Sequence, residues 1–148
     1  MLEHVFNKVN ELPANLETIG AHAFDYCRSL AVIDAIKCTA LQTIDIHAFA
    51  HCLSLVSFYI PDSVTGIRDS VFIGCRSLTT VRLHSNIATI ASNAFDGTVL
   101  RTVLWNNLDG SAYTTDRTGY DNWVAATVDS TSALATNLKS DHMSVTVA

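Results

Sequence analysis

A single apolar pattern recurs four times between Leu16 and Trp105 of this 148-residue chain. Each copy has a leucine, isoleucine or valine, an isoleucine three residues later, and then Ala-Phe or Val-Phe; three copies continue with Cys-x-Ser-Leu. The phenylalanines at positions 24, 49, 72 and 95 are 25, 23 and 23 residues apart. A period of this length is typical of solenoids, in which repeat units stack along one axis. We therefore predict a solenoid over residues 16–105.

Each copy divides into a strand half and a return half. In Leu78–Leu83, Val81 and Leu83 alternate with polar neighbours, which predicts a short strand. Strands of successive copies are expected to stack in parallel, about 4.8 Å apart. The return half, as in Ile90–Phe95, is expected to form one short helical turn that buries its phenylalanine. The predicted fold class is an α/β solenoid, mostly β: a right-handed superhelix with a parallel sheet on the concave face and short helical or 3-10 turns on the return side.

Apolar residues at equivalent repeat positions are expected to form buried ladders through the core. Burying one such side chain stabilises the fold by roughly 1.5–3 kcal/mol relative to exposure. The predicted ladders are Ile19/Ile44/Ile67/Ile90, Phe24/Phe49/Phe72/Phe95 and Leu30/Leu55/Leu78/Leu100.

The repeat resembles the BspA-like leucine-rich repeat, also called the Treponema pallidum type. The resemblance rests on the Ala-Phe-x-x-Cys-x-Ser-Leu core and on the segment Ile60–Thr65, and covers about 90 residues. The chain departs from that pattern at Thr98, where a cysteine is expected, after Leu83, where proline is missing, and by two extra residues around Cys38. The resemblance implies an interaction role in adhesion and in host or matrix contact.

The two ends of the chain lie outside the regular repeat. Residues 1–15 are interpreted as a degenerate N-terminal repeat, because Leu12-Pro13 matches Ile60-Pro61. Residues 106–148 are interpreted as a C-terminal cap, with a partly disordered tail as the alternative. A terminal repeat unit exposes an apolar edge that needs covering, and Trp105, Tyr120 and Trp123 are candidates for it. A short helix over 132–139 and a strand over 144–147 are expected there.

Charge and hydropathy exclude several classes of partner. The net charge is −5 and no cluster of lysine or arginine occurs, which argues against nucleic acid and against polybasic attachment to a membrane. No apolar run reaches the roughly 18 residues of a membrane span, and the first residues lack the apolar core of a signal peptide. The thiols favour a reducing, cytoplasmic compartment, whereas the family resemblance favours the cell surface. Localisation is left open between them.

The chemically reactive residues mostly recur with the repeat, which indicates structural roles. Cys27, Cys52 and Cys75 share one position, and their wide spacing is unlike the close pairs of zinc sites. We interpret them as core filler. The position of His22 and His47 continues as Ser70 and Asn93, which indicates capping or local hydrogen bonds. A metal site built from His22 and His47 with Asp25 or His51 is a disfavoured alternative, so we predict no metal and no cofactor.

Residues that vary between copies mark a candidate binding surface on the concave face. Side chains flanking each buried strand residue are expected to point outward, and tyrosine and arginine are types favoured at binding hot spots. The predicted partner-binding residues are Asp34, Ser57, Tyr59, Thr80, Arg82, His84, Thr102 and Leu104, with Val32 beside them.

These residues favour a non-enzymatic interaction module that binds a protein or a cell-surface ligand. One alternative is a structural fragment of a longer repeat array, for which end-to-end self-association through the first repeat unit near Leu12–Leu16 is expected. The other is an enzyme with a site in residues 106–148, where several aspartates form no recognised constellation. Those aspartates are Asp109, Asp116, Asp121, Asp129 and Asp141.

Overall fold

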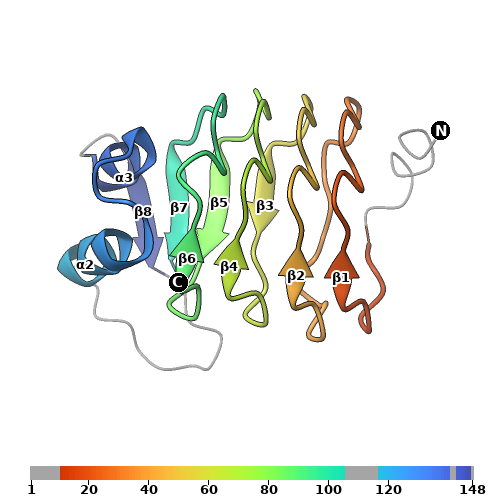
Figure 1. The fold of residues 1–148 in the computed structure, drawn as a ribbon, viewed down its shortest axis with the longest axis horizontal. Helices are drawn as coiled ribbons and strands as arrows, with labels where there is room; N and C mark the ends of the chain where they lie inside the picture. The colour runs from red at the N-terminus through yellow and green to blue at the C-terminus, as the bar shows by residue number, and fades with distance from the viewer. Residues whose placement is uncertain (1–10, 106–116, 141–142, 148) are drawn as a thin grey trace.

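The computed structural model describes residues 11–105, 117–140 and 143–147, and shows a stack of repeat units that runs the length of the molecule (Figure 1). We call the units coils 1 to 4: residues 16–40, 41–63, 64–86 and 87–105. Each coil carries a two-residue strand at its start, and coils 2 to 4 carry a second, longer strand. The predicted parallel β-solenoid is therefore confirmed.

The strands of the coils form three parallel sheets. One sheet pairs β1 (Thr18–Ile19) with β2 (Thr43–Ile44), and another pairs β4 (Gly66–Ile67) with β6 (Thr89–Ile90). The four-stranded sheet has the order β3-β5-β7-β8. Its strands are β3 (Ser57–Tyr59), β5 (Thr80–Leu83), β7 (Thr102–Trp105) and β8 (Ser144–Val147).

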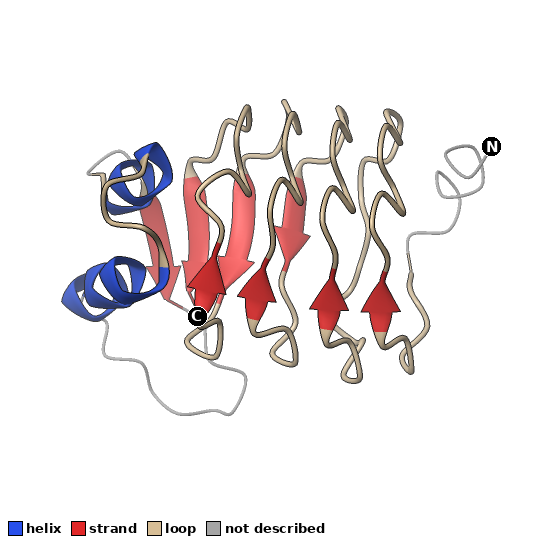
Figure 2. Cartoon of the chain, in the orientation of Figure 1, coloured by secondary structure: helices blue, strands red, loops and turns tan. Residues whose placement is uncertain are grey.

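The return side of the coils is drawn as loops and turns without helix (Figure 2). These turns are hydrogen-bonded and have left-handed residues at fixed places. In coil 1 the amide of Ala23 donates to Gly20 and the amide of Cys27 donates to Phe24. The third residues of these turns, His22 and Tyr26, have φ of 59° and 60°, which is the pattern of a type II turn. Because a left-handed residue interrupts a helix, these turns take the place of the expected helical or 3-10 turn.

The position of Tyr26 is left-handed in every coil, and it is occupied by His51, Gly74 and Gly97 in coils 2 to 4 with φ of 57°, 71° and 76°. Two glycines at one repeat position are the sequence signal for this conformation, since glycine alone adopts it without steric penalty. At the preceding turn, His47 and Ser70 repeat the positive φ of His22.

We expect Gly74→Ala to lower the free energy of unfolding by about 2 kcal/mol. Its φ is +71°, and an added Cβ would lie 2.6 Å from Cδ2 of His51, so the ring has to move as well. The matched control is Gly20→Ala, whose added Cβ meets nothing within 4 Å and which should change stability by less than about 0.5 kcal/mol. Urea unfolding of both variants measures the difference, and equal midpoints would contradict the expectation.

The core is a set of ladders that run parallel to the stacking axis. Phe24, Phe49, Phe72 and Phe95 stack with centroid distances of 5.0, 5.6 and 5.2 Å and interplanar angles of at most 10°. The isoleucine and leucine ladders are buried as well. Repeated serines stabilise the same stack, because the hydroxyls of Ser54 and Ser77 donate to main-chain carbonyls of the preceding coil. The predicted ladders are confirmed.

The described part of residues 106–148 packs against coil 4. Helix α2 (Arg117–Thr127) brings Tyr120 and Trp123 onto Trp105, with ring centroids 5.5 and 4.6 Å away. The indole N–H of Trp123 donates to the carbonyl of Ile87 at 3.0 Å. Helix α3 (Ala133–Lys139) begins after the N-cap Ser132, and β8 extends the four-stranded sheet. The short helix and the strand expected near 132–139 and 144–147 are both present.

Residues 1–10 lie outside the described residues, so of the segment 1–15 that is interpreted as a degenerate repeat the structure describes only 11–15. Glu11 forms a parallel bridge with Asp34. The amide of Leu16 donates to Pro13, as the amide of Val64 donates to Pro61. Residues 11–16 thus repeat the geometry that leads from a strand into the next coil.

Candidate functional site

The outer face of the four-stranded sheet is the candidate surface, and its strands are in exact repeat register. Ser57, Thr80, Thr102 and Ser144 are mutual partners and form one row across β3, β5, β7 and β8. The row beside it contains Tyr59, Arg82 and Leu104. Between the rows lie the buried residues Phe58, Val81 and Val103. Because side chains alternate along a strand, the side chains of both rows leave the backbone on the side of the sheet away from the core.

Exposure on this face is greatest at its coil 1 and coil 2 end. Tyr59 is 42% exposed and Val32, which occupies the repeat position of Ser57, is 53% exposed. Val56, immediately before β3, is 49% exposed. Ser57, Thr80, Thr102 and Leu104 are half-buried. The exposed residues thus form an apolar group next to a row of hydroxyls.

Arg82 was predicted to be an exposed contact residue, and that prediction is wrong. Its side chain is only 3% exposed; Nη1 donates to the carbonyl of Ile60 at 2.5 Å and Nη2 pairs with Asp62 at 2.8 Å. The guanidinium therefore joins coil 3 to the segment that leaves β3 in coil 2. The strand pattern places Arg82 on the outward row, but its long side chain turns back to main-chain and carboxylate oxygens.

His84 was also predicted to be an exposed contact, and it is buried, with 1% exposure. Its Nε2 donates to the carbonyl of Pro61 at 2.9 Å, and among the described residues its Nδ1 has no hydrogen-bond partner. Burial lowers the pKa of His84, and the hydrogen bond to Pro61 offsets part of that effect. His84 is therefore a neutral residue that holds the turn beginning at Pro61. Pro61 occupies the repeat position that Pro13 has in the segment before coil 1.

Asp34, the remaining acidic residue of the predicted surface, is half-buried and bonds within its own segment. Its carboxylate accepts the amide of Ile36 at 2.9 Å. This is an Asx turn, and it begins the two-residue insertion. The sulfur of Cys38, at the end of that insertion, lies 3.4 Å from the carbonyl of Pro13. Asp34 therefore shapes the insertion, and its place in partner binding remains a prediction.

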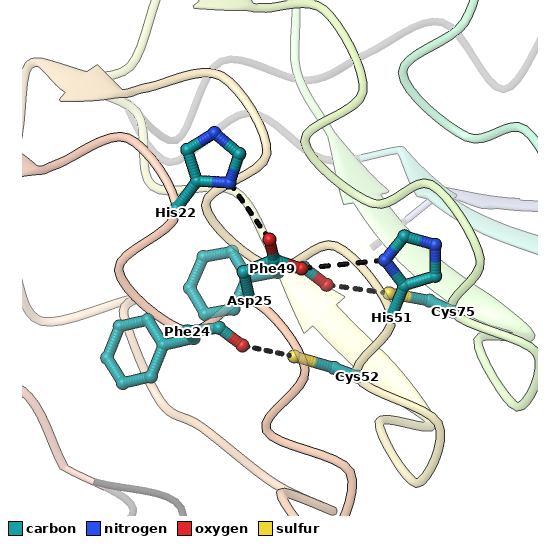
Figure 3. A network of polar contacts seen from close by, with 7 residues as sticks. All are labelled: His22, Phe24, Asp25, Phe49, His51, Cys52 and Cys75. Atoms are coloured by element: carbon teal, nitrogen blue, oxygen red, sulfur yellow. Dashed lines mark hydrogen bonds and ion pairs between the residues drawn. The ribbon is translucent and has the colours of Figure 1, made fainter.

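The cysteine ladder is part of the core (Figure 3). Cys52 Sγ donates to the carbonyl of Phe24 at 3.1 Å, and Cys75 Sγ donates to that of Phe49 at 3.0 Å. Hydrogen bonding with Cys75 and burial raise the pKa of Cys52, so this thiol stays neutral. All four cysteines are buried, and none of them forms a disulfide. Thiols that are shielded in this way give no indication of the redox compartment.

A cluster of rings and charges occupies the return side of coils 1 and 2. Asp25 accepts from Nδ1 of His22 at 2.9 Å and lies 3.4 Å from Nδ1 of His51 (Figure 3). His22 stacks on His47 and Tyr26 stacks on His51, with centroids 4.8 and 4.4 Å apart. These contacts stabilise rings at left-handed positions that coils 3 and 4 fill with small residues. The stacking was not predicted from the sequence, although the rings of each pair occupy equivalent positions in successive coils.

The described residues contain no group of three or more histidine, cysteine or acidic side chains placed to hold a metal ion. None of the described helices is long and apolar enough to cross a membrane. The five aspartates considered for an enzyme site are only partly visible, since Asp109, Asp116 and Asp141 lie outside the described residues. Asp129, which is described, bonds the backbone and hydroxyl of Thr131.

The first coil, where end-to-end self-association is expected, carries an apolar groove. The groove is lined by residues of the entry segment and of coil 1, among them Leu12, Leu16 and Ala23. Ile19 and Phe24 also line the groove, and only 3% and 5% of their surfaces are exposed. Self-association at this end remains a prediction.

Stacked parallel strands, apolar ladders and short return turns together define a leucine-rich repeat solenoid. The chain matches the family described as "BspA type Leucine rich repeat region (6 copies)" over residues 5–112. It belongs to that family. The recognition made from the repeat core is therefore confirmed.

Comparison with solved structures finds similarity to a leucine-rich cell surface protein of Faecalibacterium prausnitzii A2-165. The sequence identity is 27% and the TM-score 0.48, and the match covers 79% of this chain. It covers 34% of the other chain, so this protein spans about a third of its length. No curated protein matches the sequence.

Proposed function

We propose that this chain is a non-enzymatic interaction module whose outer β3-β5-β7-β8 face binds a protein or a cell-surface ligand, as in adhesion. Membership of a leucine-rich repeat family supports the general role, because such solenoids present extended surfaces for binding. The observation that carries the proposal is the exposure of Tyr59, 42%, on the edge strand β3 of a sheet whose other aromatic residues are buried.

The chemistry of this face favours a partner that buries apolar area beside neutral hydrogen-bonding groups. Tyr59 and Val32 supply the apolar contact, and Ser57, Thr80 and Thr102 supply hydroxyls. Arg82 and His84 are withdrawn into the fold, so the strands offer little exposed charge. Neutral, partly apolar surface with an exposed tyrosine is the usual character of an interface centre.

The test is capture of surface proteins and matrix components by the immobilised chain, with Tyr59→Ala as the variant. Loss of one hot-spot side chain should weaken binding about tenfold or more. Tyr26→Ala is the matched control, since Tyr26 is 51% exposed on the return side. A partner retained equally by wild type and Tyr59→Ala, or lost only with Tyr26→Ala, would place the binding surface elsewhere.

We also propose that residues 106–148 serve as the C-terminal cap of the stack. The contacts of Tyr120 and Trp123 with Trp105 support this role, as does the parallel pairing of β8 with β7. Together they cover the apolar edge that coil 4 would otherwise expose.

A further inference from the structure

The joint between coils 2 and 3 differs from the joints on either side of it. Strands β1 and β2 pair, and β4 and β6 pair, but β2 and β4 belong to separate sheets. Figure 1 shows β2 and β4 standing farther apart than β1 and β2. On this side of the solenoid both flanking joints are paired, so the interruption is confined to the middle joint.

Backbone hydrogen bonds identify what is missing. At the first joint the amides of Gln42 and Asp45 donate to Glu17 and Ile19, each at 2.9 Å. At the third joint the equivalent amides of Ala88 and Ala91 donate to Thr65 and Ile67, at 2.8 and 2.9 Å. The corresponding donors at the middle joint are the amides of Thr65 and Arg68. Among the described residues, neither of these two amides bonds to coil 2.

The joint remains closed on its other sides. On the return side the amides of His47, Phe49 and His51 donate to coil 3 at 3.3, 2.9 and 2.8 Å. Strand β3 pairs with β5 over three residues. The ring spacing between Phe49 and Phe72, 5.6 Å, is nevertheless the widest in the stack. The two coils are thus joined along the return side and the β3-β5 side, and open between β2 and β4.

Side chains between β2 and β4 do not fill the gap, and they bridge it only weakly. Gly66 stands where the other coils have Thr18, Thr43 and Thr89, and a groove lies between Thr43 and Thr65. Among the described residues, the only ion pair across this side joins Arg68 Nη1 to Asp45 at 2.9 Å. Their side chains are 56% and 31% exposed, and exposed pairs of this kind hold weakly and are screened by salt.

We infer that the joint between coils 2 and 3 is a hinge at which the solenoid bends. Its axis lies across the stacking direction, between the open β2-β4 side and the paired β3-β5 side, and the Arg68–Asp45 pair is its clasp. Opening at β2 and β4 increases the curvature of the β3-β5 face on the other side of the axis. The hinge is a property of the fold and does not depend on the proposed binding function.

Amide hydrogen exchange followed by NMR tests the hinge with internal controls. After correction for intrinsic rates, the amides of Thr65 and Arg68 should be protected at least tenfold less than the equivalent amides of the other two joints. The comparison amides are Gln42, Asp45, Ala88 and Ala91. Equal protection at all three joints would mean that the middle joint is closed in solution, and would overturn the inference.

The variant Arg68→Gln tests whether the ion pair restrains the motion. It should lower the protection of the His47 and Phe49 amides about threefold or more, because these bonds hold the closed side of the joint. The amides of Phe24 and Phe72, which donate across the neighbouring joints, should be unaffected. A uniform change at all joints, or no change at any of them, would contradict a hinge clasped by this pair.

Discussion

Phe49→Ala is expected to lower the free energy of unfolding by about 4 kcal/mol, the largest effect of any single change considered for this protein. Phe49 is fully buried and contacts three other rings: Phe24, Phe58 and Phe72. Truncation removes these contacts and leaves a cavity in the middle of the stack. The neighbouring backbone is held by hydrogen bonds between coils, so the cavity cannot collapse fully.

Urea unfolding followed by circular dichroism measures the effect, and two variants provide its scale. Phe95→Ala removes a ring with one partner in the stack, Phe72, and should cost less. Phe49→Leu keeps most of the volume and should cost about 1–1.5 kcal/mol. Similar losses for Phe49→Ala and Phe95→Ala would show that the rings do not act as a continuous ladder.

Arg82→Ala is expected to destabilise the protein by about 3 kcal/mol, although its sequence position predicted a solvent-exposed contact. Removing the guanidinium leaves the carbonyl of Ile60 without its donor and Asp62 without its ion-pair partner. Breaking a buried pair costs roughly 3–5 kcal/mol. The lower end applies here, because the side chain of Asp62 is 29% exposed and therefore partly screened by solvent.

Arg101→Ala is the matched control, because Arg101 immediately precedes β7 and is exposed. It should change the melting temperature by less than about 2 °C, whereas Arg82→Ala should lower it by about 10 °C or more. Equal melting temperatures for the two variants would mean that the Arg82 contacts contribute nothing to folding. Because Arg82→Ala destabilises the fold beneath the proposed binding surface, binding is tested with Tyr59→Ala alone.

The repeat made the architecture predictable, because the same apolar residue types recur at each core position in several copies. The period placed the ladders of Phe49 and Leu55, and the residues after Trp105 supplied an aromatic cluster on the last coil. The positions of Arg82 and His84 were not predictable, because strand alternation reports the side on which a side chain starts and not the oxygens it reaches. Both side chains bond main-chain carbonyls, which leave no trace in the sequence.

The hydrogen bonds between coils run in both directions along the chain, and this has a consequence during synthesis. On the side of β1 and β2 the later coil donates, as from Gln42 to Glu17; on the return side the earlier coil donates, as from Phe24 to Ala48. A coil that has just left the ribosome therefore has return-side donors whose acceptors emerge 22 to 24 positions later. Each new coil supplies the acceptors for the return-side donors of the coil before it. During synthesis, only the most recently added coil therefore has unpaired return-side donors.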